Sequence, residues 1–158
     1  MIRLEQRRWY PVGREAAFDY ITDPHNWPDY WPNLVSVADL DRARWQQPGD
    51  TMRVRMRLAG RKVDLRMTLD RFRAPSLVTY HTVQRGLPDA VHERHFEPAG
   101  DGFAYRLVVT YAPRAGLSGL LDRTVVKRGI LGALRATLDH LDHLDRLLAG
   151  VEARRHAR

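Results

Sequence analysis

The segment from Tyr10 to Leu34 limits the possible folds of this chain more than any other feature. Its sequence, YPVGREAAFDYITDPHNWPDYWPNL, has helical spacing over Gly13 to Ile21, after which Asp23 precedes Pro24. Helical geometry is disfavoured for the residue before a proline, so we expect the first helix to end there. Asp23 and Pro24 are also a typical N-cap and first residue of a second helix, which the next prolines keep short. Two short helices are therefore predicted here.

Alternating apolar and polar residues predict antiparallel strands on both sides of that segment. Ile2 to Tyr10 is the first, and Pro11 ends its hydrogen-bonded ladder. From Val35 the period is two, and later strands are predicted at Leu77 to Val83, Ala90 to Glu97 and Phe103 to Tyr111.

The most regular alternation lies on either side of Ala59 and Gly60. If these two residues form a tight turn, Met52, Val54 and Met56 face Met67, Leu65 and Val63 on one surface, while Arg53, Arg55 and Arg57 face Arg66, Asp64 and Lys62 on the other. The hairpin then has a basic outer face, made of Arg53, Arg55, Arg57, Lys62 and Arg66. Such a face is either simply solvated or contacts an anionic membrane or an acidic partner protein. Nucleic-acid binding is not predicted, because no aromatic residues interleave with these cations to stack bases.

The last two strands place polar groups inside the sheet. Pairing them through Gly100 to Gly102 sets Phe96 opposite Phe103, Arg94 opposite Tyr105 and His92 opposite Leu107, and leaves Glu93 outside, opposite Arg106. A register shifted by one residue brings Glu93 and His95 inside instead. Either register puts a histidine and a charged residue on the concave face.

A long helix is predicted from Ser118 to about Gly150. Its apolar stripe must be buried against the sheet, and consists of Ile130, Leu134, Thr137, Leu141, Leu144 and Leu148. Its first half carries small side chains, at Gly129, Gly132, Ala133 and Ala136. We expect one domain over residues 1–150, followed by a basic tail, 151–158, that contains Arg154, Arg155 and Arg158.

Composition excludes several classes of chemistry. The chain of 158 residues has no cysteine, which rules out disulfides, thiolate zinc sites and a cysteine nucleophile. It has no apolar run long enough to span a membrane and no secretory signal, so a cytoplasmic location is expected. No nucleophile elbow or glycine-rich phosphate loop is present, and no cofactor is predicted. In the run Leu138 to Arg146, Asp139 and Asp142 stand four residues before His143 and Arg146, which favours a solvated helix face over a metal site.

The order of these elements resembles the helix-grip fold of the START-like superfamily, which includes polyketide cyclases and dehydrases and lipid-transfer proteins. The matching residues are Pro11 to Phe18, Asp23-Pro24, Trp27 to Pro32, Pro48-Gly49-Asp50, Phe96-Glu97-Pro98 with Asp101-Gly102, and the closing helix. The resemblance implies an α+β fold in which a curved antiparallel sheet of about seven strands wraps around the C-terminal helix. It also implies a ligand cavity between sheet and helix.

Two groups of residues are candidates for a binding site in that cavity. Trp27, Tyr30 and Trp31 either form the rim of the pocket or plug one end of the sheet. His92 and Arg94 bind or polarise a carbonyl or carboxylate with Tyr80 and Tyr105 nearby. Alternatively, Arg94 pairs internally with Asp70 or Glu93, or extends its charged end to the surface. Leu134 and Thr137 belong to the facing helix, where Thr137 is alternatively bonded only to the carbonyl one turn earlier.

The resulting functional hypotheses belong to different classes. The first is binding or carriage of a hydrophobic small molecule, such as a lipid, isoprenoid or polyketide. The alternative is a cyclase or dehydrase enzyme in which His92 or Arg94 stabilises an enolate or moves a proton. A third is a partner-binding domain that acts through the basic outer face of the hairpin. The sequence leaves the choice between carrier and enzyme open.

Overall fold

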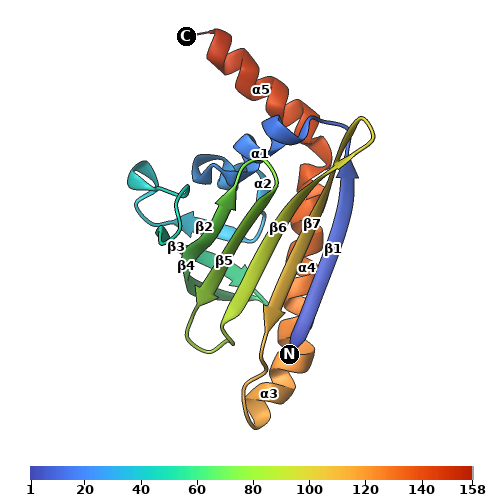
Figure 1. Cartoon of the computed structure of the whole chain (residues 1–158). Coiled ribbons are helices and arrows are strands. Elements are labelled where there is room, and N and C mark those ends of the chain that lie inside the picture. Colours follow the sequence, from blue (N-terminus) through green and yellow to red (C-terminus); the bar gives the residue numbers. More distant parts are fainter. Residues whose placement is uncertain (158) are drawn as a thin grey trace.

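One curved antiparallel sheet forms the wall of the molecule in the computed structural model, which describes residues 1–157 (Figure 1). Its strands are β1 (Ile2–Tyr10), β2 (Leu34–Val37), β3 (Thr51–Leu58), β4 (Arg61–Arg73), β5 (Leu77–Val83), β6 (Ala90–Ala99) and β7 (Gly102–Tyr111). Their order across the sheet is β1-β7-β6-β5-β4-β3-β2, so the first strand pairs with the last and each of the others with its neighbours in sequence. The predicted fold class is confirmed.

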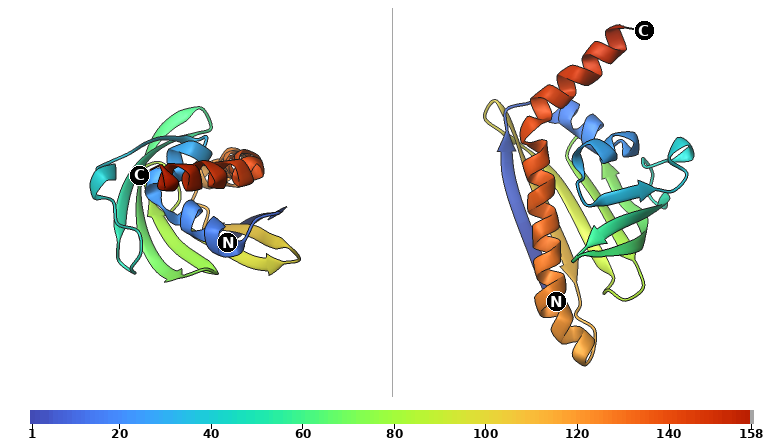
Figure 2. Two further views of the ribbon diagram at one scale, coloured as in Figure 1. Left: turned by 90° about the horizontal axis from the view of Figure 1, so that it is seen from above. Right: turned by 180° about the vertical axis from the view of Figure 1, so that it is seen from behind.

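Helices occupy the concave side of this sheet (Figure 2). The N-terminal ones are α1 (Arg14–Thr22), the 3₁₀ turn η1 (Pro24–Asn26) and α2 (Trp27–Tyr30), and a further 3₁₀ turn, η2 (Leu40–Arg42), lies between β2 and β3. The Asp23 carboxylate accepts a hydrogen bond from the backbone N–H of His25 at 3.0 Å, and Pro24 is the first residue of η1. The predicted break between the two short helices is therefore present.

The C-terminal helix consists of consecutive helical segments. These are α3 (Leu117–Leu121), the π-helix η3 (Asp122–Val126), α4 (Lys127–His140), the 3₁₀ turn η4 (Leu141–His143) and α5 (Leu144–His156). Figure 1 shows α5 leaving at an angle to α4, with the 3₁₀ turn at the junction. The helix continues past residue 150, where a basic tail was predicted to begin; Arg158, assigned to that tail, lies outside the described residues.

The apolar stripe predicted for this helix is its buried side. Leu134, Thr137, Leu141 and Leu144 are buried, while Ile130 and Leu148 are half-buried. No helix in the described part of the chain combines the length and the apolar character that crossing a bilayer requires.

The register of the β3–β4 hairpin agrees with the prediction for every pair. Met56 lies opposite Val63 and Val54 opposite Leu65, while Arg55 lies opposite Asp64. Ala59 and Gly60 form the turn, both with positive φ (49° and 77°). All five basic residues of the outer face are exposed, and one of them, Arg55, donates to Asp64 at 2.8 Å.

The predicted register of β6 against β7 is wrong by two residues. Phe96 lies opposite Tyr105, Arg94 opposite Leu107 and His92 opposite Val109. The turn consists of Gly100 and Asp101 alone, with Gly100 at φ 57°, so β6 continues to Ala99 and each partner shifts by two. Since strand side chains alternate with a period of two, the same residues still face inward.

Aromatic rings fill the interface between helix and sheet at one end, which we call the packed end. The Phe96 ring lies 4.9 Å from Phe18, 4.8 Å from Tyr105 and 5.9 Å from Phe103 between ring centroids. The Tyr10 hydroxyl donates to the carbonyl of Leu138 at 2.7 Å, which ties β1 to α4. Centroid separations of about 4.5–7 Å are the favourable range for aromatic pairs, so these rings are in close contact.

Candidate functional site

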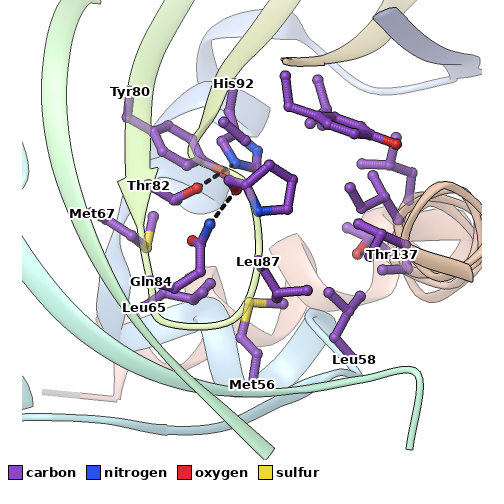
Figure 3. A pocket seen from close by; sticks show the side chains of 18 of the residues that line it. Met56, Leu58, Leu65, Met67, Tyr80, Thr82, Gln84, Leu87, His92 and Thr137 are labelled. Carbon is purple, nitrogen blue, oxygen red and sulfur yellow. Dashed lines mark hydrogen bonds between the residues drawn. The ribbon is translucent and has the colours of Figure 1, made fainter. Parts of the chain in front are cut away.

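The other end of the helix–sheet interface contains a cavity of about 90 Å³, which is partly open to solvent (Figure 3). Its apolar wall comes from β3, β4, β7 and α4, and includes Met56, Leu65, Met67, Val109, Ile130 and Leu134. The space exists because the facing helix carries small side chains there. Ala133 lines the cavity, and Gly129 lies close to Leu58 at the tip of the hairpin. We call the region around this cavity the cavity end.

A second cavity, of about 40 Å³, adjoins the first toward the packed end. The two share Trp31, Met67, Tyr80, Arg94 and Thr137 as lining residues. Arg94 and Tyr80 therefore border any group that is bound in either cavity.

Arg94 is the charged residue of this interior. It projects from the concave face of β6, between Val78 of β5 and Leu107 of β7. Its Nη2 donates to the Tyr80 hydroxyl at 2.8 Å, and its guanidinium carbon lies 5.7 Å from the centre of the Tyr80 ring. A guanidinium remains protonated in proteins, so the positive charge is held against an aromatic ring and a neutral hydroxyl.

The internal ion pair predicted as an alternative for Arg94 is wrong. Asp70 accepts from His81 at 2.9 Å, and Glu93 lies 3.2 Å from His95. Both carboxylates lie on the outer face, since Glu93 is the strand neighbour of Arg94 and so points the opposite way. Among the described residues, Arg94 has no carboxylate within ion-pair distance.

His92 lies two residues before Arg94 on the same face. Its ring stacks on Tyr80 with the centroids 4.6 Å apart and the planes 6° from parallel, and its Nε2 is 3.2 Å from the Thr82 hydroxyl. Its Nδ1 is buried and has no hydrogen-bond partner within the described part of the chain. Burial, with a smaller contribution from the charge of Arg94, lowers the pKa of His92 to about 3. The imidazole is therefore neutral at pH 7, and its Nδ1 keeps an unused capacity to form a hydrogen bond.

Of the three aromatic residues Trp27, Tyr30 and Trp31, two act as a plug at the end of the sheet and one has the position of a pocket rim. Trp27 and Tyr30 are buried and both donate to the carbonyl of Ile21, at 2.9 Å and 2.6 Å, as expected of a plug. They reach only the second cavity, whereas the half-buried Trp31 lines both cavities. Trp31 alone has the position expected of a pocket rim.

The remaining predicted site residues lie around the same space. Tyr105 lines the second cavity, and burial raises its pKa to about 12, an effect that Arg94 partly offsets. Leu134 lines the main cavity, and Thr137 lines both. The Thr137 hydroxyl donates to the carbonyl of Ala133 at 3.0 Å, as the alternative for this residue predicted, and retains only its capacity to accept.

Two polar residues of the cavity were missed from the sequence. Thr82 and Gln84 line its wall, and the Gln84 amide donates to the carbonyl of Pro88 within the loop that follows β5. Figure 3 shows both side chains beside Tyr80 and His92, facing Thr137 across the cavity. The signal was available, because Tyr80, Thr82 and Gln84 follow the period-two alternation that places Tyr80 inside.

The acidic residues of the run Leu138 to Arg146 have a different partner from the ones predicted. Arg8 of β1 binds Asp139 at 2.6 Å and Asp142 at 3.2 Å, and this ion pair joins the helix to the sheet edge. His140 contacts the carbonyl of Ala136 at 3.1 Å. No group of three or more His, Asp or Glu side chains able to hold a metal ion occurs in the described residues.

A curved antiparallel sheet closed over a long C-terminal helix, with a cavity between them, defines the START-like, helix-grip class of proteins. The sequence profile of the family described as "Polyketide cyclase / dehydrase and lipid transport" matches residues 1–144. The chain therefore belongs to this family, as the resemblance of its sequence to the START-like superfamily predicted. A search of curated proteins gives no sequence match.

Several solved structures with the same fold can be superposed on nearly the whole chain. TTHA0849 from Thermus thermophilus has a TM-score of 0.76 and 19% identity, and the match covers 94% of this chain and 99% of that one. The Zhui aromatase/cyclase from Streptomyces sp. R1128 has a TM-score of 0.71 and 14% identity, covering 90% and 94%. CalU16 from Micromonospora echinospora has a TM-score of 0.61 and 15% identity, covering 94% and 81%. At these identities the likeness establishes the fold.

Proposed function

We propose that this protein binds and carries a hydrophobic small molecule that bears a carbonyl, carboxylate or phenolate oxygen. The observation that carries this proposal is Arg94, a cation inside an apolar cavity that has no carboxylate partner among the described residues. A buried charge without a counter-charge is costly, and an anionic or strongly accepting ligand group would offset that cost. The apolar wall around it favours a hydrocarbon body on the same ligand.

The size of the cavity implies that its wall moves when a ligand enters. Pockets for drug-sized ligands have volumes of roughly 300–1,000 Å³, whereas the two cavities here are about 90 Å³ and 40 Å³. Met56 and Met67 belong to the wall, and methionine side chains repack readily around different shapes. Under this proposal the cavity widens as these side chains repack around the ligand. We place this binding activity in the cytoplasm.

The proposal is tested with two probes of one shape, 2-naphthoate and the neutral 2-naphthamide, measured by isothermal titration calorimetry. Arg94→Met should weaken binding of naphthoate roughly 10- to 100-fold, because a hydrogen bond to a charged group contributes about 1.5–3 kcal/mol. Binding of naphthamide should change much less. Arg66→Met on the outer face is the matched control and should alter neither affinity. Failure of the wild-type protein to bind either probe, or equal losses in the two arginine variants, would contradict the proposal.

An enzymatic function is the second candidate, and the observation that favours it is His92. His92 and Arg94 line the same cavity, so one substrate can contact both residues. In an aldol ring closure an enol carbon adds to a carbonyl, and the C=O π bond becomes an alkoxide that Arg94 would stabilise. The enol proton passes to that oxygen, and loss of water then gives the aromatic ring. A neutral imidazole with a pKa of about 3 accepts protons weakly, so His92 would orient the substrate by a hydrogen bond. The fold shared with an aromatase/cyclase agrees with this chemistry.

Turnover separates the two functions. The protein is incubated with an acyclic poly-β-ketone thioester, and the formation of an aromatic product is followed by absorbance. An enzyme should accelerate ring closure over the uncatalysed rate, and Arg94→Met and His92→Asn should each remove that acceleration. A carrier should bind the thioester and leave its rate of cyclisation unchanged. If both variants cyclised the substrate as fast as the wild type, the enzymatic function would be excluded.

The basic outer face of the hairpin remains a candidate contact surface for an acidic partner protein. Arg53, Arg57, Lys62 and Arg66 are exposed, and none of them has an ion-pair partner among the described residues. Association through this face should weaken as salt is added, because exposed charges are screened.

A further inference from the structure

An apolar row is exposed at the start of the C-terminal helix. Leu117, Leu120, Leu121 and Val125 are 83%, 60%, 52% and 49% exposed. These are four of the nine large apolar side chains that are exposed in the described chain, and they lie within nine consecutive residues. Scattered surface leucines need no explanation, but a contiguous row of them marks an interaction surface. We call α3 and η3 together, residues Leu117–Val126, the helix tip.

The helix tip is held rigidly in this position. Asp122, fully buried, accepts from Arg114 through the backbone N–H at 2.8 Å and through the guanidinium at 2.7 Å and 3.0 Å. The Tyr111 hydroxyl donates to the Asp122 carbonyl at 2.7 Å. Gly119 allows the chain to fold back closely, since a Cβ atom there would lie 2.0 Å from the Arg114 carbonyl oxygen. The fold therefore buries one side of the tip and presents the leucines on the other.

The charges near the row are of one sign. Arg123, Lys127 and Arg128 are exposed on the same stretch of helix. Asp122 is the only acidic residue between Tyr111 and Asp139, and Arg114 neutralises it. An apolar row flanked by unopposed cations is complementary to a surface that is negative outside and apolar within. It is poorly suited to a second copy of a chain that carries a net charge of +7.

The helix tip also lies next to the cavity end. Figure 1 shows α3 projecting beyond the sheet, at the opposite end from α5, and the second view in Figure 2 shows the same projection. Val126, the last residue of the tip, lines the main cavity together with Leu58 of the hairpin and Leu87 of the loop after β5. A surface bound by the tip would therefore be close to this side of the cavity.

We propose that the helix tip docks the protein onto an anionic lipid bilayer. Leu117, Leu120 and Leu121 enter the interface, and Arg123, Lys127 and Arg128 contact lipid phosphates. Docking in this orientation brings the cavity end to the membrane, where an apolar molecule passes between bilayer and protein without crossing water. The docking itself does not depend on what the cavity binds.

Binding of the full chain to vesicles tests this proposal by co-sedimentation. The protein should bind vesicles of phosphatidylcholine mixed with phosphatidylglycerol, bind pure phosphatidylcholine much more weakly, and be released from the mixed vesicles by added salt. The double variant Leu120→Ser/Leu121→Ser should lose at least about 10-fold in partitioning, because it removes the apolar insertion. Val83→Ser/Val91→Ser, which changes two exposed valines on the outer face of the sheet, is the matched control and should bind normally.

Charge variants distinguish the helix tip from the basic outer face of the hairpin. Lys127→Ser/Arg128→Ser should reduce partitioning by about 5-fold for each cation removed. Arg53→Ser/Arg66→Ser removes the same charge from the hairpin and should have little effect. Thermal unfolding of each variant checks that it remains folded, and Arg94→Met should bind vesicles normally, so failure of ligand binding and failure of docking are distinguishable.

Three results would overturn the proposal. The first is the absence of binding to mixed vesicles. The second is equal loss in the tip variants and their controls, which would indicate attraction by net charge alone. The third is a concentration-dependent dimer, seen by sedimentation velocity and abolished by Leu120→Ser/Leu121→Ser, which would make the row a self-association surface.

Discussion

The same helix contacts the same sheet at the packed end and at the cavity end, but the two contacts differ in kind. At the packed end, aromatic rings fill the interface, Leu141 and Leu144 of the helix are fully buried, and the Tyr10 hydroxyl donates to a backbone carbonyl. At the cavity end, Ala133 and Gly129 face methionines and leucines, and polar groups remain partly unpartnered. Stability is therefore concentrated at one end, and the capacity to bind at the other.

The largest expected effects come from one substitution made at both ends. Leu141→Ala should lower the free energy of unfolding by about 3–5 kcal/mol, because it leaves a void among fully packed neighbours. Leu134→Ala should cost only about 2–3 kcal/mol, because this side chain already borders a cavity and has fewer contacts to lose. Urea denaturation measures both. Equal losses would show that the cavity end is packed as tightly as the other.

Acid should act on the cavity end through His92. The pKa of His92 is lowered to about 3 in the folded protein, against about 6.5 in an unfolded chain. Between these values the unfolded chain binds a proton that the folded protein does not, so stability is complete above pH 6.5 and is lost as pH falls toward 3. The loss should reach roughly 2 kcal/mol at pH 5.

Chemical denaturation between pH 8 and pH 5 measures this loss. His92→Asn should remove most of the difference, whereas His143→Asn, a change of an exposed side chain on the C-terminal helix, should leave it intact. A wild-type protein equally stable at pH 5 and pH 8 would show that His92 is solvated in the folded state.

The parts of the fold that were predictable from sequence are those in which a local signal had one solution. A two-residue turn at Ala59 and Gly60 is the one that places apolar residues opposite apolar ones and charged residues opposite charged ones along the hairpin. The register that follows from this turn is confirmed. Gly100, Asp101 and Gly102 permit more than one turn, and the register chosen there was wrong by two residues.

The site was partly predictable for a related reason. Period-two alternation survives a two-residue shift, so His92 and Arg94 were assigned to the inner face correctly. For Arg94, the neighbouring Tyr80 was predicted correctly, whereas the alternative ion pair with Asp70 or Glu93 was wrong. The contact of Asp139 and Asp142 with Arg8 depends on which elements meet, and it was not predicted. The exposed row of the helix tip was missed because helical spacing cannot distinguish a buried stripe from an exposed one at a helix end that extends beyond the sheet.

Filling the cavity should separate binding from stability. Ala133→Leu places three more carbon atoms in the main cavity, and should raise the free energy of unfolding by up to about 1 kcal/mol. The same change should abolish binding of 2-naphthoate, because it occupies the ligand space. Gly132→Ala on the exposed side of α4 should also stabilise the helix by up to about 1 kcal/mol, but leave naphthoate binding intact. Unchanged binding by Ala133→Leu would place the ligand elsewhere.

The smallest expected effect tests whether packing or charge holds the helix at the packed end. Arg8 binds Asp139 and Asp142, but all three side chains are substantially exposed, and exposed ion pairs contribute only about 0.2–1 kcal/mol. Arg8→Gln should therefore cost less than about 1 kcal/mol, and the cost should shrink in high salt. Arg7→Gln is the matched control on the same strand, since Arg7 pairs with Glu97 of the sheet and not with the helix. A loss well above 1 kcal/mol that persists in high salt would mean that this ion pair, more than the buried leucines and aromatic rings, fixes the helix against the sheet.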